Sequence, residues 1–256
     1  MQAGDSIVAA IHAANAADRP AIIAFLTAGF PRREAFITTL ARVATVADVV
    51  EIGVPFTDPM ADGMTIQRSS RAALEQGVTL RWILESLGRA ERPAAPLLLM
   101  SYLNPLLAYG LDRLADAAQR VGVAGFIVPD LPYEESAELR EALEPHRLAL
   151  VQLVTPVTPP ERLAMLCAAS QGFVYAVTMT GTTGKSVEVP DDVLTYMDRV
   201  RAASEVPVCA GFGIRSSEQV ARMRGHVDGV IVGSALVEVL ERDEDPARFL
   251  ESLRPR

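Results

Sequence analysis

Two carboxylates, Glu51 and Asp62, flank a segment that glycine and proline interrupt repeatedly. Glu51 lies near the end of an apolar run, and Asp62 precedes a glycine and then a helical pattern. Burial raises the pKa of one carboxyl group while polar surroundings keep another ionised, so such a pair can divide the work of a proton donor and an acceptor. The structural alternatives are a capping or salt-bridging glutamate and an aspartate in an Asx-turn. The segment is the first candidate for an active site.

Glycine-rich segments form a second group of candidate residues. They follow three apolar runs and comprise residues 178–185 (TMTGTTGK), 211–214 (GFGI) and 233–234 (GS). Glycine lets backbone N–H groups approach an anion closely, and the N-terminus of a following helix adds partial positive charge. For any one segment, a glycine that simply ends a strand is the alternative. Together the three segments predict a phosphate site.

Short apolar runs alternate with amphipathic helical patterns along the chain. This alternation predicts parallel strands with right-handed crossovers, and eight such units in 256 residues fit a (β/α)8 barrel. An open doubly wound sheet is the alternative, but no G-x-G-x-x-G follows the first run. We expect a TIM barrel forming one domain, residues 1–256, with an extra N-terminal helix. The expected strands are Ala21–Thr27, Val46–Ile52, Pro96–Met100, Gly125–Val128, Leu148–Val154, Phe173–Val177, Val206–Ala210 and Gly229–Val232.

The helical patterns lie between these runs, and the loops after the strands carry the polar residues. Because active sites of such barrels lie at the carboxyl ends of the strands, Glu51, Asp62 and the glycine segments all fall on the expected working face. Residues 101–105 (SYLNP) are expected to form a loop there. The expected helices are Ile7–Ala17, Arg32–Thr45, Met64–Arg89 with a break near Gly77, Leu111–Val121, Glu134–Leu143, Pro160–Ala169 and Ser217–Arg224.

Composition and charge exclude several classes of protein. The net charge of -8 and the pI near 5.0 leave no basic surface for nucleic acid. The N-terminus lacks a basic leader pattern and no stretch reaches 18 apolar residues, so neither export nor membrane insertion is expected. Cys167 and Cys209 are far apart among apolar or small residues, which indicates buried thiols in a reducing compartment. We expect a cytoplasmic protein.

Several blocks of the sequence resemble the tryptophan synthase alpha subunit family, and together they span nearly the whole chain. They are residues 26–29 (LTAG), 51–67 (EIGVPFTDPMADGMTIQ), 102–105 (YLNP), 125–132 (GFIVPDLP), 173–184 (FVYAVTMTGTTG), 211–214 (GFGI) and 228–237 (DGVIVGSALV). The resemblance implies a TIM-barrel lyase that cleaves indole-3-glycerol phosphate to indole and glyceraldehyde 3-phosphate. The reaction is a retro-aldol cleavage in which the indole ring accepts the electrons.

The resemblance also implies a role for each matching residue. Glu51 would protonate the indole carbon that bears the side chain and assist removal of the glycerol hydroxyl proton. Asp62 would accept the ring N–H and stabilise positive charge on the ring nitrogen. Thr183 would reach Asp62 when the loop after the sixth strand closes. The other expected substrate-binding residues are Tyr175 and, less specifically, Tyr102 for the indole pocket, and Gly184, Gly213, Gly233 and Ser234 for the phosphate.

Retro-aldol cleavage can also use a lysine Schiff base or a metal ion. The only lysine, Lys185, lies in a glycine- and threonine-rich loop segment rather than in a strand. His12, His146 and His226 have no metal-ligand spacing. Neither a metal nor a cofactor is expected, and acid–base catalysis by carboxyl groups remains.

The resemblance implies a partner as well, a pyridoxal-phosphate-dependent tryptophan synthase beta subunit in an alpha2beta2 complex that docks on the loop Pro55–Pro59. Phe30, Met64 and Thr182 depart from the family pattern, which bears on loop rigidity and partner contacts rather than on the chemistry. Two alternatives stay open, a stand-alone indole-3-glycerol phosphate lyase and a catalytically idle paralogue that regulates a beta subunit. The intact pair of carboxylates argues against the idle paralogue.

Overall fold

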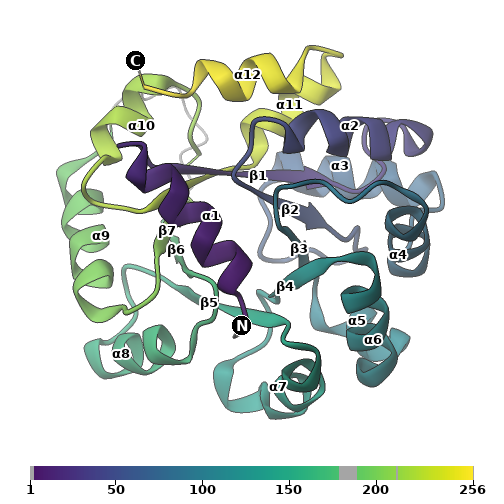
Figure 1. Ribbon diagram of the computed structural model, residues 1–256, viewed down its shortest axis with the longest axis horizontal. Coiled ribbons are helices and arrows are strands. Elements are labelled where there is room, and N and C mark those ends of the chain that lie inside the picture. Colours follow the sequence, from purple (N-terminus) through teal and green to yellow (C-terminus); the bar gives the residue numbers. More distant parts are fainter. Residues whose placement is uncertain (1–2, 179–188, 212, 256) are drawn as a thin grey trace.

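The computed structural model describes residues 3–178, 189–211 and 213–255. Its strands are all parallel and pair in chain order, and the last strand pairs with the first, so the sheet is a closed barrel. Helices surround the strands (Figure 1). The predicted (β/α)8 barrel is confirmed. The strands are β1 (Ala21–Thr27), β2 (Val49–Gly53), β3 (Leu97–Met100), β4 (Val123–Ile127), β5 (Ala149–Val154), β6 (Val174–Val177), β7 (Val208–Gly211) and β8 (Gly229–Val232).

Among the described residues, one or two α-helices follow each strand along the chain, and three short 3-10 turns lie next to two of these helices. Within the described residues, no helix is long and apolar enough to span a membrane. The helices are α1 (Asp5–Ala16), α2 (Phe36–Ala44), α3 (Met64–Glu75), α4 (Leu80–Arg89), α5 (Leu103–Tyr109), α6 (Leu111–Val121), α7 (Ala137–Leu143), α8 (Pro160–Ala169), α9 (Asp191–Ala203), α10 (Ser217–Met223), α11 (Ser234–Glu241) and α12 (Pro246–Ser252), and the turns are η1 (Arg33–Ala35), η2 (Tyr133–Glu135) and η3 (Glu144–His146).

Side chains alternate between the bore of the barrel and the layer beneath the helices, because successive residues of a strand point to opposite faces. In β2, Val49 belongs to the apolar cluster inside the bore, whereas Val50 and Ile52 belong to the larger cluster under the helices. Glu51 is two residues beyond Val49 and therefore points into the bore. Thus the strand alone determines which way this carboxyl group faces.

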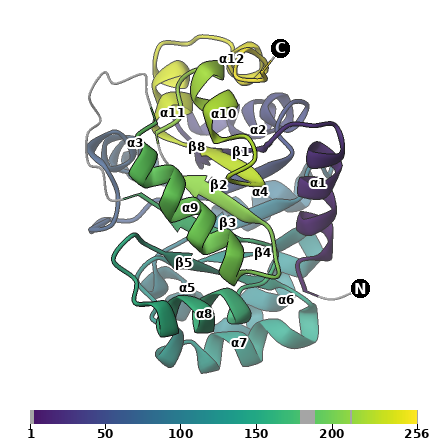
Figure 2. The ribbon, with the colours of Figure 1, turned by 90° about the vertical axis from the view of Figure 1, so that its left-hand side faces the viewer.

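Helix α1 closes the amino-terminal end of the bore. Its residues Ile7, Ile11 and Ala14 are fully or almost fully buried and pack in the same cluster as Ile23 and Phe173 inside the barrel. Figure 1 shows α1 lying across the strands, and Figure 2 shows it at one side of the barrel. The predicted N-terminal helix is thus part of the core, and it leaves the opposite end of the bore for ligands.

Some element boundaries agree with the sequence prediction and others differ from it. The expected break near Gly77 is confirmed, since α3 ends at Glu75 and Gly77 has a positive φ of 73°. The expected loop 101–105 instead starts helix α5 at Leu103, with Pro105 in its first turn, where proline is tolerated. Strand β2 starts later than expected, because a helix-end turn donates the N–H of Val46 to the carbonyl of Val43.

Candidate active site

Glu51 is the most deeply buried carboxyl group at the working end of the barrel, with none of its surface exposed. Its Cα pairs in register with that of Phe25 in β1. Neither carboxyl oxygen has a hydrogen-bond partner among the described residues. Burial without a partner raises the pKa of Glu51 to about 8. The group is therefore protonated at neutral pH and able to donate a proton.

Asp62 lies in the loop between β2 and α3, where its backbone N–H donates to the carbonyl of Pro59 at 3.1 Å. Its own carbonyl accepts from Nε2 of Gln67 at 2.8 Å. Burial raises the pKa of Asp62 to about 6, although a hydrogen bond from the Tyr102 side chain lowers it. The loop is more enclosed than its polar composition suggested. Asp62 nevertheless remains mostly ionised at neutral pH.

Tyr102 fixes the loop that carries Asp62. The residue precedes α5 and is almost fully buried. Its hydroxyl oxygen accepts from the N–H of Ala61 at 2.9 Å while the hydroxyl group bonds to the carboxylate of Asp62. Burial and the neighbouring charge of Asp62 raise the pKa of Tyr102 to about 12, so the hydroxyl keeps its proton. The ring also stacks on Phe56, with 5.0 Å between centroids.

A pocket opens between the carboxyl ends of β1, β2 and β3. Asp62, Tyr102 and three hydroxyl side chains form its polar part, four apolar side chains form the rest, and its free volume is about 20 Å³. The lining residues are Phe25, Thr27, Gly53, Val54, Asp62, Ile66, Ser70, Met100, Ser101 and Tyr102.

Tyr175 lies inside the bore on β6, next to the buried glutamate. Its pKa is raised well above the usual value, first by burial and then by the charges of Glu51 and Asp62. Its ring leaves no room beside Gly211, because a Cβ at Gly211 would lie 2.8 Å from Cε1 of Tyr175. The structure thus brings three residues expected in the site, Glu51, Asp62 and Tyr175, to one end of the barrel.

The expected phosphate residues lie beyond β7 and β8. Gly213 has a positive φ of 75°, and a side chain there would meet nothing within 4 Å. Gly233 precedes α11 and Ser234 begins it, and no side chain caps this helix. Helix α10 differs, since Ser216 and Gln219 form a capping box at its N-terminus. The first N–H groups of α11 are therefore available to an anion.

Some expected residues fall outside the part of the chain that the structure describes. They are Thr183 and Gly184 of the proposed loop, together with Thr182 and Lys185. Within the described residues, no three His, Cys, Asp or Glu side chains gather as a metal site. Both cysteines are free and buried, as predicted.

Several pocket residues, chiefly Phe25 and Met100, were not predicted from the sequence. Both lie near the carboxyl end of a strand and line the pocket beside the carboxylates. Phe25 is two residues beyond Ile23 of the bore cluster, so the alternation of the strand contained a signal for it. The hydrogen bond between Ala61 and Tyr102 had no such signal, because it joins residues 41 positions apart.

The fold and the site define a class of protein: a (β/α)8 barrel that carries two carboxyl groups of raised pKa at the carboxyl ends of its strands. The family model for the tryptophan synthase alpha chain matches residues 11–253. The tryptophan synthase alpha chain of Desulfovibrio desulfuricans is 46% identical over 94% of this chain and 96% of its own length. That of Chloroflexus aurantiacus is 43% identical over 89% and 86%.

Solved structures agree with these relatives. A crystal structure of tryptophan synthase from M. tuberculosis in an open form superposes with a TM-score of 0.87 at 35% identity, covering 96% of both chains. The alpha subunit from Legionella pneumophila gives 0.87 at 30% identity, covering 97% of both. The chain belongs to the tryptophan synthase alpha chain family. It is a carbon–carbon lyase that cleaves indole-3-glycerol phosphate in tryptophan biosynthesis.

Proposed function

We propose that Glu51 and Asp62 divide the acid–base work of this cleavage. The observation that carries the proposal is the difference between their surroundings. Burial without a partner gives Glu51 a pKa of about 8, whereas Tyr102 helps to hold the pKa of Asp62 near 6. Near pH 7 one carboxyl group is therefore protonated and the other ionised. Two carboxyl groups whose pKa values differ in this way suit an acid and a counter-ion in one site.

Glu51 acts first as the acid. It gives its proton to the indole carbon that bears the glycerol chain, which leaves positive charge on the ring nitrogen. The resulting carboxylate then takes the proton of the hydroxyl on the adjacent glycerol carbon. As that oxygen becomes a carbonyl, the carbon–carbon bond breaks and its electrons return to the ring. Indole, which keeps the proton from Glu51 on its carbon, and glyceraldehyde 3-phosphate are released, and Glu51 is left protonated by the hydroxyl proton.

Asp62 accepts the hydrogen bond of the ring N–H and stabilises the positive charge that forms there. The hydroxyl of Tyr102 and the loop bonds at Asp62 support this position of the carboxylate. A preorganised negative group lowers the barrier because it need not reorganise as the charge develops. Tyr175 and Phe25 would enclose the indole ring.

The phosphate end of the substrate binds near Gly213, Gly233 and Ser234. The uncapped N-terminus of α11 supports this part of the proposal, because its backbone N–H groups and helix dipole favour an anion. Gly184 and Thr183 remain predictions for the same substrate.

The roles of the carboxyl groups are tested by Glu51→Gln and Asp62→Asn. Each keeps the shape of the side chain, and each should remove most indole formation while binding of a glycerol phosphate analogue is kept. Turnover is followed as indole release, and analogue binding by calorimetry. A near-normal rate for Glu51→Gln would refute its role as the acid.

We also propose that a beta subunit docks on the loop Pro55–Pro59 and the residues that follow it. Met60 and Met64 are 87% and 75% exposed there, and large apolar side chains so exposed commonly mark a protein interface. The solved tryptophan synthase of M. tuberculosis supports such a partner. Met64 is also one of the positions that departs from the family pattern.

The docking surface is tested by replacing Met60 and Met64 together with serine. The pair should weaken beta-subunit binding at least tenfold in calorimetry. Val157→Ser is the matched control, since Val157 is 73% exposed but follows β5, three strands around the barrel. Equal effects of the two variants would refute this surface. Turnover of the chain with and without the beta subunit separates an alpha subunit from a stand-alone lyase, and inactivity in both would support an idle paralogue.

A further inference from the structure

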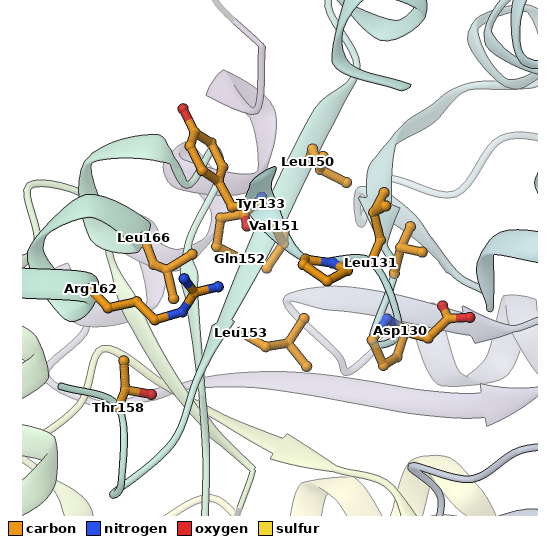
Figure 3. A pocket seen from close by; sticks show the side chains of 13 residues that line it. Asp130, Leu131, Tyr133, Leu150, Val151, Gln152, Leu153, Thr158, Arg162 and Leu166 are labelled. Atoms are coloured by element: carbon orange, nitrogen blue, oxygen red, sulfur yellow. The ribbon is translucent and has the colours of Figure 1, made fainter. Parts of the chain in front are cut away.

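A second pocket, of about 280 Å³, lies outside the barrel wall at β5. Figure 3 shows it between the segment from Asp130 to Tyr133, strand β5 and the side chains of Arg162 and Leu166 from α8. This volume is near the lower end of the range of small-molecule sites, about 300–1,000 Å³. Glu51 and Asp62 do not line it.

The lining of this pocket includes residues from both faces of β5, and it shares no residue with the pocket beside Asp62. Val151 belongs to the apolar cluster inside the bore, and Leu153 packs against that cluster. Leu150 and Gln152 alternate with them and so point outward, toward the helices. Because the two linings have no residue in common, the second pocket is distinct from the pocket beside Asp62.

Gln152 is the unusual residue of this pocket. It is only 6% exposed and lies among the lining side chains (Figure 3). Its backbone N–H donates to Oγ of Ser170 at 2.9 Å, but its side-chain amide has no hydrogen-bond partner within the described part of the chain. The amide atoms are not among the fully buried atoms that lack a partner, so they lie at the surface of the pocket. The N–H and C=O of Gln152 are therefore open to a molecule that enters the pocket and pairs with both.

The remaining walls indicate the chemistry of that ligand. Leu131, Leu150 and Leu166 offer apolar contacts. Arg162 is the cation at the rim, but its two terminal nitrogens are already bound to both carboxylate oxygens of Glu134, at 2.5 and 3.0 Å. An anion would compete with Glu134 for the guanidinium group, and a cation would be repelled by it. A neutral ligand has neither cost.

We propose that this pocket binds a small, neutral, planar molecule that carries a carboxamide or lactam group. Such a group presents a donor and an acceptor side by side, so it forms two hydrogen bonds with the amide of Gln152. The apolar part of the molecule packs between the leucines. The site goes beyond the lyase reaction and shares none of its proposed catalytic groups.

The test uses the full-length chain and benzamide as the probe, in a titration followed by 1H–15N NMR. Benzamide should shift the side-chain NH2 signals of Gln152, which are assigned by their loss in Gln152→Leu. The leucine variant should bind benzamide about tenfold more weakly, because both hydrogen bonds are lost. Toluene, which lacks the amide, should bind this variant at least as well as the wild type. Benzoate should bind the wild type more weakly than benzamide.

Leucine fills a similar volume without a polar group, so the variant should fold, and its unchanged rate of indole formation serves as the control for an intact barrel. Equal benzamide affinity in the two proteins would overturn the proposal. So would unshifted Gln152 side-chain signals at saturating benzamide. Failure here leaves the roles of Glu51 and Asp62 unaffected, because those are measured by turnover of Glu51→Gln and Asp62→Asn.

Discussion

Replacing Glu51 by glutamine should make the protein more stable at high pH while it abolishes activity. The pKa of Glu51 rises from 4.5 to about 8 because the group is buried without a partner. A group whose pKa is raised on folding stabilises the native state fully below its unfolded pKa, and this contribution is lost as the pH rises through the folded pKa. The wild type therefore loses stability between pH 4.5 and 8 on account of this residue.

The size of the loss follows from the same two values. Each pKa unit corresponds to about 1.4 kcal/mol, so a rise from 4.5 to about 8 corresponds to a loss of about 5 kcal/mol at most. Total stabilities of domains are about 5–15 kcal/mol, so the effect is large enough to measure. The glutamine amide has no proton to lose. Any cost of burying it unpaired is about 1–3 kcal/mol and is the same at every pH.

The assay is urea unfolding of wild type and Glu51→Gln at pH 5, 7 and 9, analysed by linear extrapolation. The difference in unfolding free energy should favour glutamine increasingly as the pH rises, and it should level off above pH 8. Other titrating groups are common to both proteins and cancel in the difference. Glu91→Gln is the control for the same substitution at an exposed carboxyl group, since Glu91 is exposed after α4. A difference that is flat with pH would refute the reasoning.

Three further predictions concern the same end of the barrel. The pH profile of kcat/KM for indole formation should be bell-shaped, with limbs near 6 and 8 from the two carboxyl groups. Tyr102→Phe should shift the acid limb to higher pH by about one pH unit, because the charged form of Asp62 loses a stabilising hydrogen bond. Tyr196→Phe is the control, since it removes a buried hydroxyl that has no partner and should leave the pH profile unchanged. Gly211→Ala should lower kcat/KM more than tenfold at unchanged analogue affinity, because its Cβ would lie 2.8 Å from the Tyr175 ring.

Strands were predicted well because their burial leaves a plain signal in the sequence. Every residue of β1 is buried, and its run Ala21–Thr27 has the predicted bounds. The start of α5 was missed because residues 101–105 were assigned to the loop after the third strand, although Pro105 in the first turn of a helix costs no helical hydrogen bond. A buried apolar run therefore locates a strand directly. A proline does not decide between loop and helix, because it is compatible with both a loop and the first turn of a helix.

The two carboxyl groups differ in how far the sequence could place them. Glu51 faces the bore because it alternates with Val49 in one strand, which the sequence shows directly. Its high pKa follows from that position alone. The surroundings of Asp62 depend on residues far away in the chain, so its raised pKa could not be inferred from the composition of its loop.

Tyr102 is where these distant contacts meet. Its hydroxyl holds the loop after β2, its ring stacks on Phe56 of the proposed docking loop, and the next residue, Leu103, donates its N–H to Oδ1 of Asp130 at 2.9 Å. Loops after β2, β3 and β4 therefore fix Asp62 jointly. A partner that docks on residues 55–59 would contact the loop that Phe56 ties to Tyr102, and so would affect Asp62, the carboxylate proposed to bind the ring nitrogen. Glu51, held by its strand, is insulated from such a partner. The barrel thus keeps the proposed proton donor in a strand of its wall and places the proposed charge-stabilising group on a loop beside the proposed docking surface.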